Sequence, residues 1–188
     1  MNLTGFPRRT LRGDRDIYRI HRYDRFAWWF SSDGSGRFDP VGTSMGACYL
    51  AEKPLGAWVE VFRRGMLIAE VEVQVRRLGA ITLGRDLRLA NLASRRALQF
   101  GVTASLGADQ DYAASQAFAR AALEYGFDGL RYLVRHDPAQ QLYGIALFSD
   151  AGAAVDDGNW PPARSTEIPE IIIESACRRF GYRILPTP

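Results

Sequence analysis

Three charged side chains in the first third of the sequence have types and spacing that suit chemistry on an anionic substrate. Arg19 lies in a short alternating segment, Arg37 in a loop rich in glycine, and Glu60 in an amphipathic segment. Because Glu60 follows Val59 of the apolar stripe, its carboxylate is expected at the edge of the core, where a carboxylate usually has a partner. Arg19 or Arg37 could be that partner, so a purely structural ion pair is one interpretation.

Familiar catalytic motifs do not meet their structural requirements in this chain. Gly34 and Gly36 form a Gly-x-Gly pair, but no third glycine follows at the spacing of a dinucleotide-binding fingerprint. Residues 42–46 match Gly-x-Ser-x-Gly, but a loop precedes the serine and a strand follows it, the reverse of a nucleophile elbow. A turn is therefore favoured over a serine hydrolase that uses His136. His21 and His136 also lack the spacing of metal ligands, so no metal site is expected.

Composition limits the class of protein. Of the 188 residues, 47% are hydrophobic and 24% are charged, which is typical of one globular domain and excludes a disordered chain. Lys53 is the only lysine, and the excess of arginine fits either genomic base composition or phosphate binding. The net charge is +3 and the arginines are scattered among 21 acidic residues, so we expect no direct nucleic-acid binding.

The sequence gives no sign of membrane insertion or secretion. No apolar run approaches the roughly 18 residues of a membrane span, and the N-terminus has no apolar secretory core. Cys48 and Cys177 are far apart and form no Cys-x-x-Cys motif. We therefore expect a cytoplasmic protein without a membrane or a disulfide framework.

Hydrophobic periodicity predicts a mixture of strands and helices. The predicted strands are 16–21, 47–51, 66–75, 78–83, 129–134, 142–148 and 182–185. The predicted helices are 54–64, 87–100, 109–125 and 169–179, and the predicted long loops are 31–46 and 151–165. Adjacent strands with interspersed helices indicate an α+β fold with small, mostly antiparallel sheets and flanking helices.

The segments that hold these charged residues resemble, in order, the segments of the RES domain family, named for an arginine, a glutamate and a serine. The first four similar segments are Tyr18-Arg19-Ile20-His21, Gly36-Arg37-Phe38-Asp39-Pro40, Tyr49-Leu50-Ala51 and Ala57-Trp58-Val59-Glu60. The later ones are 112–116, 127–132, 135–138 and 146–148. The resemblance covers 16–150 and implies a catalytic domain there. The basic composition of 1–15 predicts a mobile segment, and 151–188, beyond the resemblance, are expected to form a C-terminal extension that packs on the same domain.

The resemblance also implies a function. Members of the family have a fold related to mono-ADP-ribosyltransferases and are typically toxins of bacterial toxin–antitoxin pairs that deplete NAD by hydrolysis or phosphorolysis. NAD is then the substrate, and no further cofactor is needed. The implied partner is an antitoxin with a helix-turn-helix part that covers the NAD pocket, and the chain can form a homodimer within such a complex. The alternatives are ADP-ribosyl transfer to a protein target and a non-catalytic binding module.

By resemblance, Glu60 is the catalytic carboxylate, which stabilises an oxocarbenium-like state at the ribose. Arg19 and Tyr49 are its catalytic companions, and Arg19, followed by Arg37, is expected to bind the pyrophosphate. Tyr49 or Phe38 offers a flat wall for nicotinamide.

Two further NAD-binding candidates and one departure complete the resemblance. His21 and Ser115 are the additional binding candidates. Val134 occupies the position where the family often has a serine, and valine has no hydroxyl. Ser115 is the candidate substitute, although a serine on a helix also caps or packs. This departure leaves open a changed acceptor, with phosphate in place of water, or a weakened enzyme; whether water, phosphate or a protein is the acceptor stays open.

Overall fold

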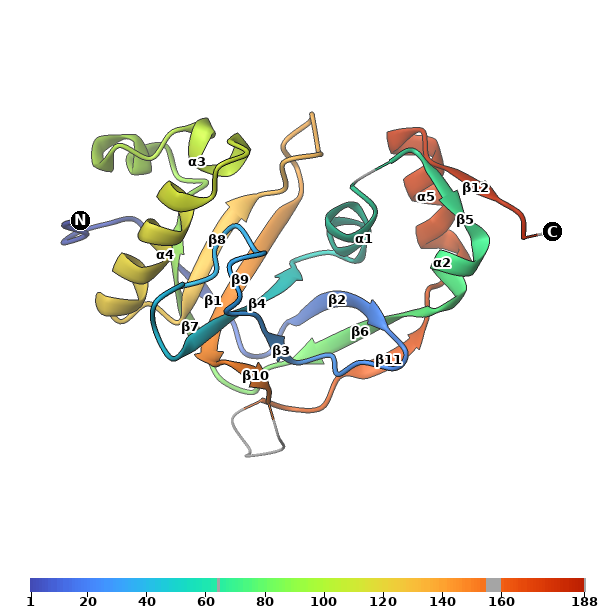
Figure 1. Ribbon diagram of the computed structural model, residues 1–188, viewed down its shortest axis with the longest axis horizontal. Helices are drawn as coiled ribbons and strands as arrows, with labels where there is room; N and C mark the ends of the chain where they lie inside the picture. Colours follow the sequence, from blue (N-terminus) through green and yellow to red (C-terminus); the bar gives the residue numbers. More distant parts are fainter. Residues whose placement is uncertain (64, 155–159, 188) are drawn as a thin grey trace.

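The computed structural model describes residues 1–63, 65–154 and 160–187, and it is built on one eight-stranded sheet (Figure 1). The strand order is β1-β7-β8-β9-β4-β2-β6-β11. Neighbouring strands are antiparallel, except that β7 and β8 are parallel. The strands are β1 (Arg8–Leu11), β2 (Asp16–Arg22), β4 (Met45–Ala51), β6 (Arg76–Thr82), β7 (Leu87–Asn91), β8 (Gly129–Leu133), β9 (Tyr143–Asp150) and β11 (Arg164–Glu167).

Two small sheets and the helices surround this sheet. The small sheets pair β3 (Trp29–Phe30) with β10 (Gly152–Ala153), and β5 (Leu67–Ala69) with β12 (Arg183–Leu185). The helices are α1 (Pro54–Phe62), α2 (Glu70–Gln74), α3 (Ala104–Ala108), α4 (Ala113–Glu124), α5 (Glu170–Phe180) and a 3₁₀ helix (Arg95–Phe100). Helices α3 and α4 lie at one end of the molecule and α5 at the other, with α1 between them (Figure 1). The predicted α+β class with mostly antiparallel pairing is confirmed.

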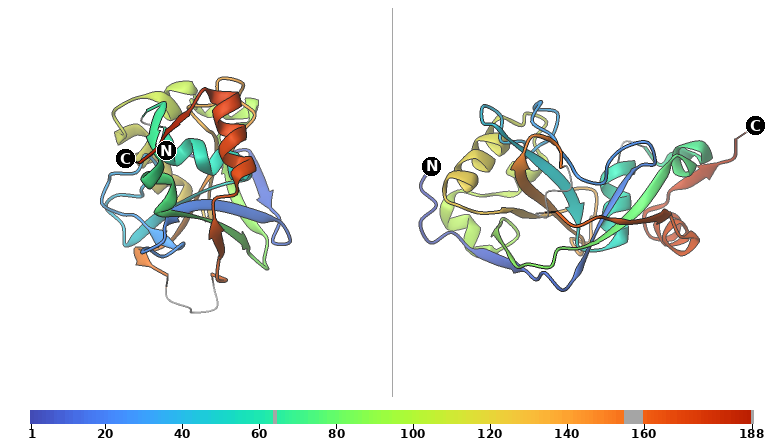
Figure 2. Two further views of the ribbon diagram at one scale, coloured as in Figure 1. Left: turned by 90° about the vertical axis from the view of Figure 1, so that its right-hand side faces the viewer. Right: turned by 90° about the horizontal axis from the view of Figure 1, so that it is seen from below.

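The sheet divides where β2 meets β4. Strand β4 pairs with β9 from Met45–Asp150 to Ala51–Gly144, but β2 and β4 share only the pair Tyr18–Ala51. The two strands therefore diverge, and helix α1, which follows β4 directly, lies beside the gap (Figures 1 and 2). Separate apolar clusters stabilise the two sides, one centred on α4 and one on α1 and α5.

Helix α1 forms for the reasons that the sequence indicates. Pro54 occupies the first turn, where its missing N–H costs nothing. Leu55, Val59 and Phe62 form the buried stripe, and Trp58 is fully buried against Phe62, with ring centroids 4.3 Å apart. This packing fixes the rotation of the helix and therefore the direction of the residues beside the stripe.

The prediction of one strand over 66–75 is wrong. Only Leu67–Ala69 is a strand, and Glu70–Gln74 forms helix α2. A strand needs a backbone partner, and β12 offers residues 183–185 alone. The alternating pattern also misleads about burial, because Leu67 and Val71 are exposed.

The predicted helix over 87–100 is also wrong. Leu87–Asn91 is strand β7, which lies between β1 and β8, and only Arg95–Phe100 is helical. Leu87 and Leu89 alternate into one apolar cluster, as a strand between two partners requires. The predicted helix over 109–125 begins later, at Ala113, whose N–H donates to Asp111 Oδ1 at 2.9 Å.

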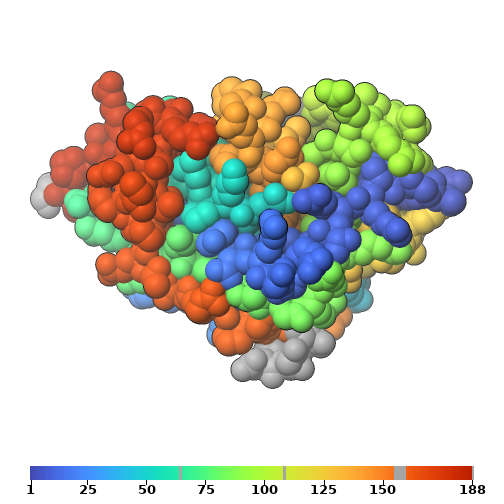
Figure 3. Space-filling model, turned by 180° about the vertical axis from the view of Figure 1, so that it is seen from behind, coloured from blue at the N-terminus to red at the C-terminus, as the bar shows by residue number. Residues whose placement is uncertain are grey.

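The two ends of the chain are built into the fold. The segment expected to be mobile, 1–15, contributes edge strand β1 and buries Leu3 and Phe6 in the α4 cluster. Within the predicted loop 151–165, β10 forms and β11 begins, while 155–159 lie outside the described residues. From behind, the C-terminal residues form one end of the molecule, and the N-terminal residues extend from its centre to the other end (Figure 3).

Candidate functional site

A cavity of about 360 Å³ opens where β2 and β4 diverge. This volume lies within the range of small-molecule sites. Its walls come from β2, the loop before β4, β4 itself, α1, and the turn after β8. The charged lining residues are Arg19, Arg37, Glu60, Arg63 and Arg135, and the aromatic ones are Tyr18, Phe38, Tyr49, Tyr112 and Tyr132.

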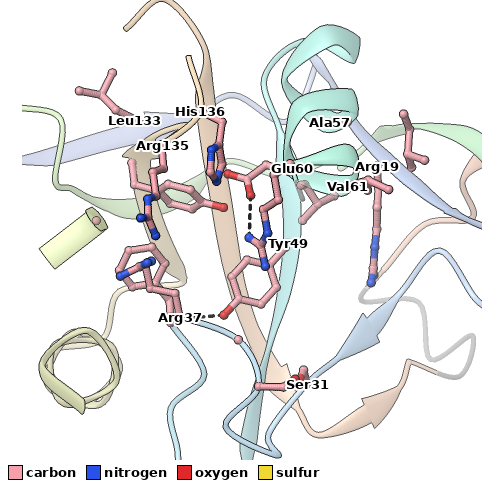
Figure 4. Close-up of a pocket in the computed structure, with 18 of the residues that line it drawn as sticks. Arg19, Ser31, Arg37, Tyr49, Ala57, Glu60, Val61, Leu133, Arg135 and His136 are labelled. Carbon is pink, nitrogen blue, oxygen red and sulfur yellow. Dashed lines mark hydrogen bonds and ion pairs between the residues drawn. The ribbon is translucent and has the colours of Figure 1, made fainter. Parts of the chain in front are cut away.

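Glu60 is the single carboxylate among the described lining residues. Its side chain is 18% exposed, and its Oε2 lies 3.4 Å from Arg63 Nη1, one helical turn away (Figure 4). The ion pair expected with Arg19 or Arg37 is therefore formed with Arg63. Burial raises the pKa of the Glu60 carboxyl above its ordinary value, and the charges of Arg63 and Arg37 oppose that rise.

The loop that carries Arg37 is held by the buried carboxylate of Asp39. Asp39 accepts from Ser31 Oγ at 3.0 Å, from Gly36 N–H at 2.9 Å and from Tyr49 Oη at 2.8 Å. A Cβ at Gly36 would overlap Asp39 and the Tyr49 hydroxyl, so this approach requires glycine. The loop is thus fixed against β4 before any ligand binds.

Tyr49 joins this loop to the cavity. Its hydroxyl donates to Asp39 and accepts from the Phe38 N–H at 2.8 Å. Burial, followed by the charge of Asp39, raises the pKa of Tyr49 well above its ordinary value, so the phenol stays neutral. Because both contacts of the hydroxyl are structural, the ring is the part of Tyr49 that is free to meet a ligand.

Three guanidinium groups gather around Glu60. Arg37 packs 4.5 Å from the ring centroid of Tyr112 and donates to Leu106 O at 3.3 Å. Burial lowers the pKa of Arg37, and the positive charges of Arg135 and Arg63 lower it further. In Figure 4, Arg37 and Arg135 lie on the side of the cavity opposite Arg19. With one acidic group among them, these arginines leave an excess of positive charge.

A short turn brings Arg135 and His136 to the cavity. The buried Asp137 accepts from Gln141 N–H at 2.6 Å and from Leu142 N–H at 2.7 Å, which closes the turn. Burial lowers the pKa of His136, and so do the charges of Arg135, Arg63 and Arg37. The imidazole is therefore neutral at neutral pH, beside Glu60 (Figure 4).

Arg19 lines the cavity but does not point at Glu60. Its Nη1 donates to Ala27 O and Trp29 O and lies 2.8 Å from Cys48 Sγ. In Figure 4 the guanidinium extends away from Glu60. The structure therefore brings Glu60, Tyr49 and Arg37 together and holds the Arg19 guanidinium on backbone carbonyls.

The remaining binding candidates differ in position. Phe38 lines the cavity with its ring packed on Tyr132. His21 lies outside the cavity, with Nε2 3.0 Å from Ser165 Oγ. Ser115 is buried and donates to Leu106 O at 2.6 Å, a packing role. Val134 lies in the α1 cluster, so the departure from the family serine falls in the core rather than on the cavity wall.

Sequence reasoning assigned no role to four lining residues. Arg63 could have been found from its spacing of three residues after Glu60 on a helix. Tyr112, Tyr132 and Arg135 lie in segments that resemble the family, but nothing in the sequence assigned any of them a role in the site.

Within the described ranges, no group of three or more His, Cys, Asp or Glu side chains could hold a metal ion. A helix long and apolar enough to cross a membrane is likewise not found in the described part of the chain.

Comparisons with known proteins agree with the fold. The family model described as RES domain matches residues 16–165. A chain of the crystal structure of the M. tuberculosis MbcT–MbcA toxin–antitoxin complex is similar with a TM-score of 0.67 and 21% sequence identity. The match covers 88% of this chain and 90% of that chain, and at this identity it shows a shared fold. No curated protein matches the sequence.

Proposed function

The chain belongs to the RES domain family, and from this premise we propose that it is the toxin of a toxin–antitoxin pair that consumes NAD. The observation that carries the proposal is the grouping of Arg37, Arg63 and Arg135 around the single carboxylate of Glu60. A cavity with this excess of positive charge favours an anion, and guanidinium groups bind phosphate oxygens well. The pyrophosphate of NAD is such an anion.

The proposed reaction breaks the bond between ribose C1′ and the nicotinamide nitrogen. The bonding electrons go to nicotinamide, which neutralises its ring, and positive charge develops on the ribose. In its ionised form the Glu60 carboxylate stabilises that charge, more strongly in a buried site than in water. An oxygen of water or phosphate then bonds to C1′ and releases a proton. Because nicotinamide is itself the leaving group, NAD is the substrate and the proposal needs no metal or further cofactor.

Other cavity residues have separate roles in this proposal. Arg37, held on the Tyr112 ring, binds the pyrophosphate, and the Tyr49 and Phe38 rings form the wall for nicotinamide. Arg19 supports the β2 wall through its contacts with Ala27 and Cys48.

The same proposal includes a protein partner. An antitoxin with a helix-turn-helix part would cover the cavity in the cytoplasm, and the chain can pair with a second copy within that complex. The similarity to a chain of a toxin–antitoxin complex supports this assignment.

The first experiment follows NAD concentration over time with purified protein, with and without phosphate. Loss in both conditions indicates hydrolysis, and loss only with phosphate indicates phosphorolysis. Glu60→Gln keeps the shape but removes the charge, so the rate should fall on the order of 10²-fold. The control is Asp16→Asn, which breaks a surface ion pair on β2 and should leave the rate unchanged.

Three results would decide against parts of this proposal. Intact NAD in both conditions contradicts NAD consumption and favours a binding module. An unchanged rate for Glu60→Gln contradicts the role of Glu60. Radiolabel that moves from NAD onto a protein, rather than into free ADP-ribose, would make the chain an ADP-ribosyltransferase.

A further inference from the structure

The hydroxyl of Tyr132 is buried and has no hydrogen-bond partner among the described residues. The whole residue is 7% exposed. Buried polar groups are nearly always hydrogen-bonded, and an exception calls for an explanation. Trp58 Nε1 is also buried without a partner, but Trp58 packs inside the α1 cluster and does not line the cavity. Tyr132 does line it.

The ring of Tyr132 cannot turn away to find another partner. On one side it packs on Phe38, with ring centroids 4.9 Å apart. On the other side it lies over Gly144, its partner in the pairing of β8 with β9. A Cβ at Gly144 would overlap the ring and its hydroxyl oxygen. Glycine in the middle of a strand often marks such a close approach, so two distant segments hold this ring in place.

The hydroxyl lies close to the Glu60 carboxylate and interacts with it weakly, but the two groups do not meet the geometry of a hydrogen bond. Burial, followed by the charge of Glu60, raises the pKa of Tyr132 well above its ordinary value. The phenol is therefore neutral and keeps its proton, so it can donate a hydrogen bond to a ligand. Tyr49 in the same cavity is different, because its hydroxyl already donates a hydrogen bond to Asp39 Oδ1.

We propose that the Tyr132 hydroxyl is a substrate-recognition group that donates a hydrogen bond to a hydroxyl of the ribose beside Glu60. This inference rests on the proposed function, because Glu60 must approach the nicotinamide-bearing ribose to stabilise its developing charge. A fixed donor next to Glu60 meets the same sugar. A site built to bond a sugar hydroxyl rejects an analogue that lacks it, so the cavity should prefer ribose over deoxyribose.

The test compares Tyr132→Phe with Tyr49→Phe, two variants that each remove one hydroxyl from the same cavity. Calorimetry measures the binding of ADP-ribose and of two analogues that lack the 2′- or the 3′-hydroxyl of the ribose that bears nicotinamide in NAD. Thermal unfolding measures stability. Tyr132→Phe should weaken ADP-ribose binding about 10-fold. It should also abolish the preference over one deoxy form, and its melting temperature should be unchanged or higher.

The control should behave in the opposite way. Tyr49→Phe removes the contacts with Phe38 N–H and Asp39, so its melting temperature should fall.

Each failure has its own signature. If the parent binds ADP-ribose and Tyr132→Phe binds ADP-ribose and both deoxy forms with the same affinities as the parent does, the recognition role is wrong. If Tyr132→Phe instead loses stability and shifts the pH dependence of NAD loss, the hydroxyl serves Glu60 and not the substrate. If the parent binds neither ADP-ribose nor NAD, the proposed function fails, and this inference fails with it.

Discussion

The Asp39 loop and the interior around Glu60 form adjacent walls of one cavity, and they treat buried polar groups in opposite ways. Asp39 is fully buried, and its carboxylate accepts from Ser31, Gly36 and Tyr49. Around Glu60, three arginines face one carboxylate, and the Tyr132 hydroxyl has no partner in the described chain.

The difference separates a structural region from a binding region. A buried polar group without a partner costs about 1–3 kcal/mol, so the Glu60 region lowers stability in the free protein. The satisfied network at Asp39 and the apolar clusters on both sides of the cavity offset that cost. The excess of positive charge and the unpaired Tyr132 hydroxyl in one cavity are what a polar, anionic ligand would satisfy.

The largest effect should come from the satisfied region. Asp39→Ala leaves the Gly36 N–H and the Tyr49 hydroxyl without their acceptor, so the free energy of unfolding should fall by about 3 kcal/mol. Urea denaturation measures this change. Asp39→Asn keeps an acceptor oxygen and should lose less. A loss under about 1 kcal/mol for Asp39→Ala would remove the contrast between the two regions.

An effect of opposite sign is expected in the binding region. The raised pKa of Glu60 means that the folded protein holds this proton more tightly than the unfolded chain. As pH rises from the ordinary value of 4.5 through the raised value, ionisation of Glu60 lowers stability. Glu60→Gln should therefore be at least as stable as the parent at pH 7, with any advantage lost below pH 4.5.

The measurement is the unfolding free energy of both proteins between pH 4 and pH 8. A Glu60→Gln variant that is less stable than the parent at pH 7 would show that the carboxylate stabilises the fold through Arg63. The contrast with Asp39 would then be lost.

The smallest effect should come from a surface pair outside both regions. Asp16 accepts from Arg164, 2.7 Å away, and this contact joins β2 to β11. Hydrogen bonds from Thr82 and then Arg164 lower the pKa of Asp16, so its contribution is present above the ordinary value of 3.8 and is lost as pH falls. Asp16→Asn should cost roughly 0.5 kcal/mol at pH 7, measured by urea denaturation. A loss above about 2 kcal/mol would show that the Asp16–Arg164 pair stabilises the fold as the Asp39 network does.

The local sequence predicted the elements whose apolar pattern matches their burial in the folded protein. The stripe of Leu55, Val59 and Phe62 with Pro54 predicted α1, and the position of Glu60 beside Val59 predicted a carboxylate at the edge of the core. Strands β4, β8 and β9 were predicted because their runs are buried and bounded by turns. The members of the site were therefore partly predictable from patterns within single elements.

Local sequence failed where a distant segment decides the outcome. The alternation over 66–75 is as regular as that of any strand in the molecule, but only 67–69 find a partner, in β12 near the end of the chain. Arg19 lines the cavity, as its predicted role requires, but carbonyls of the 27–29 segment hold its guanidinium in this structure. Neither result could be derived from spacing, because each depends on how another segment of the folded chain is placed against these residues.

The sequence by itself determined the fold class, helix α1 and the place of Glu60 at the edge of the core, because periodicity and turn residues act over a few positions. Only the tertiary structure decided that Arg37 and Arg135 approach the Glu60 cavity and that the Tyr132 hydroxyl has no hydrogen-bond partner among the described residues. Phe38, Tyr132 and Gly144 come from three separate segments. Their contact depends on how the strands order in the sheet, which no local pattern encodes.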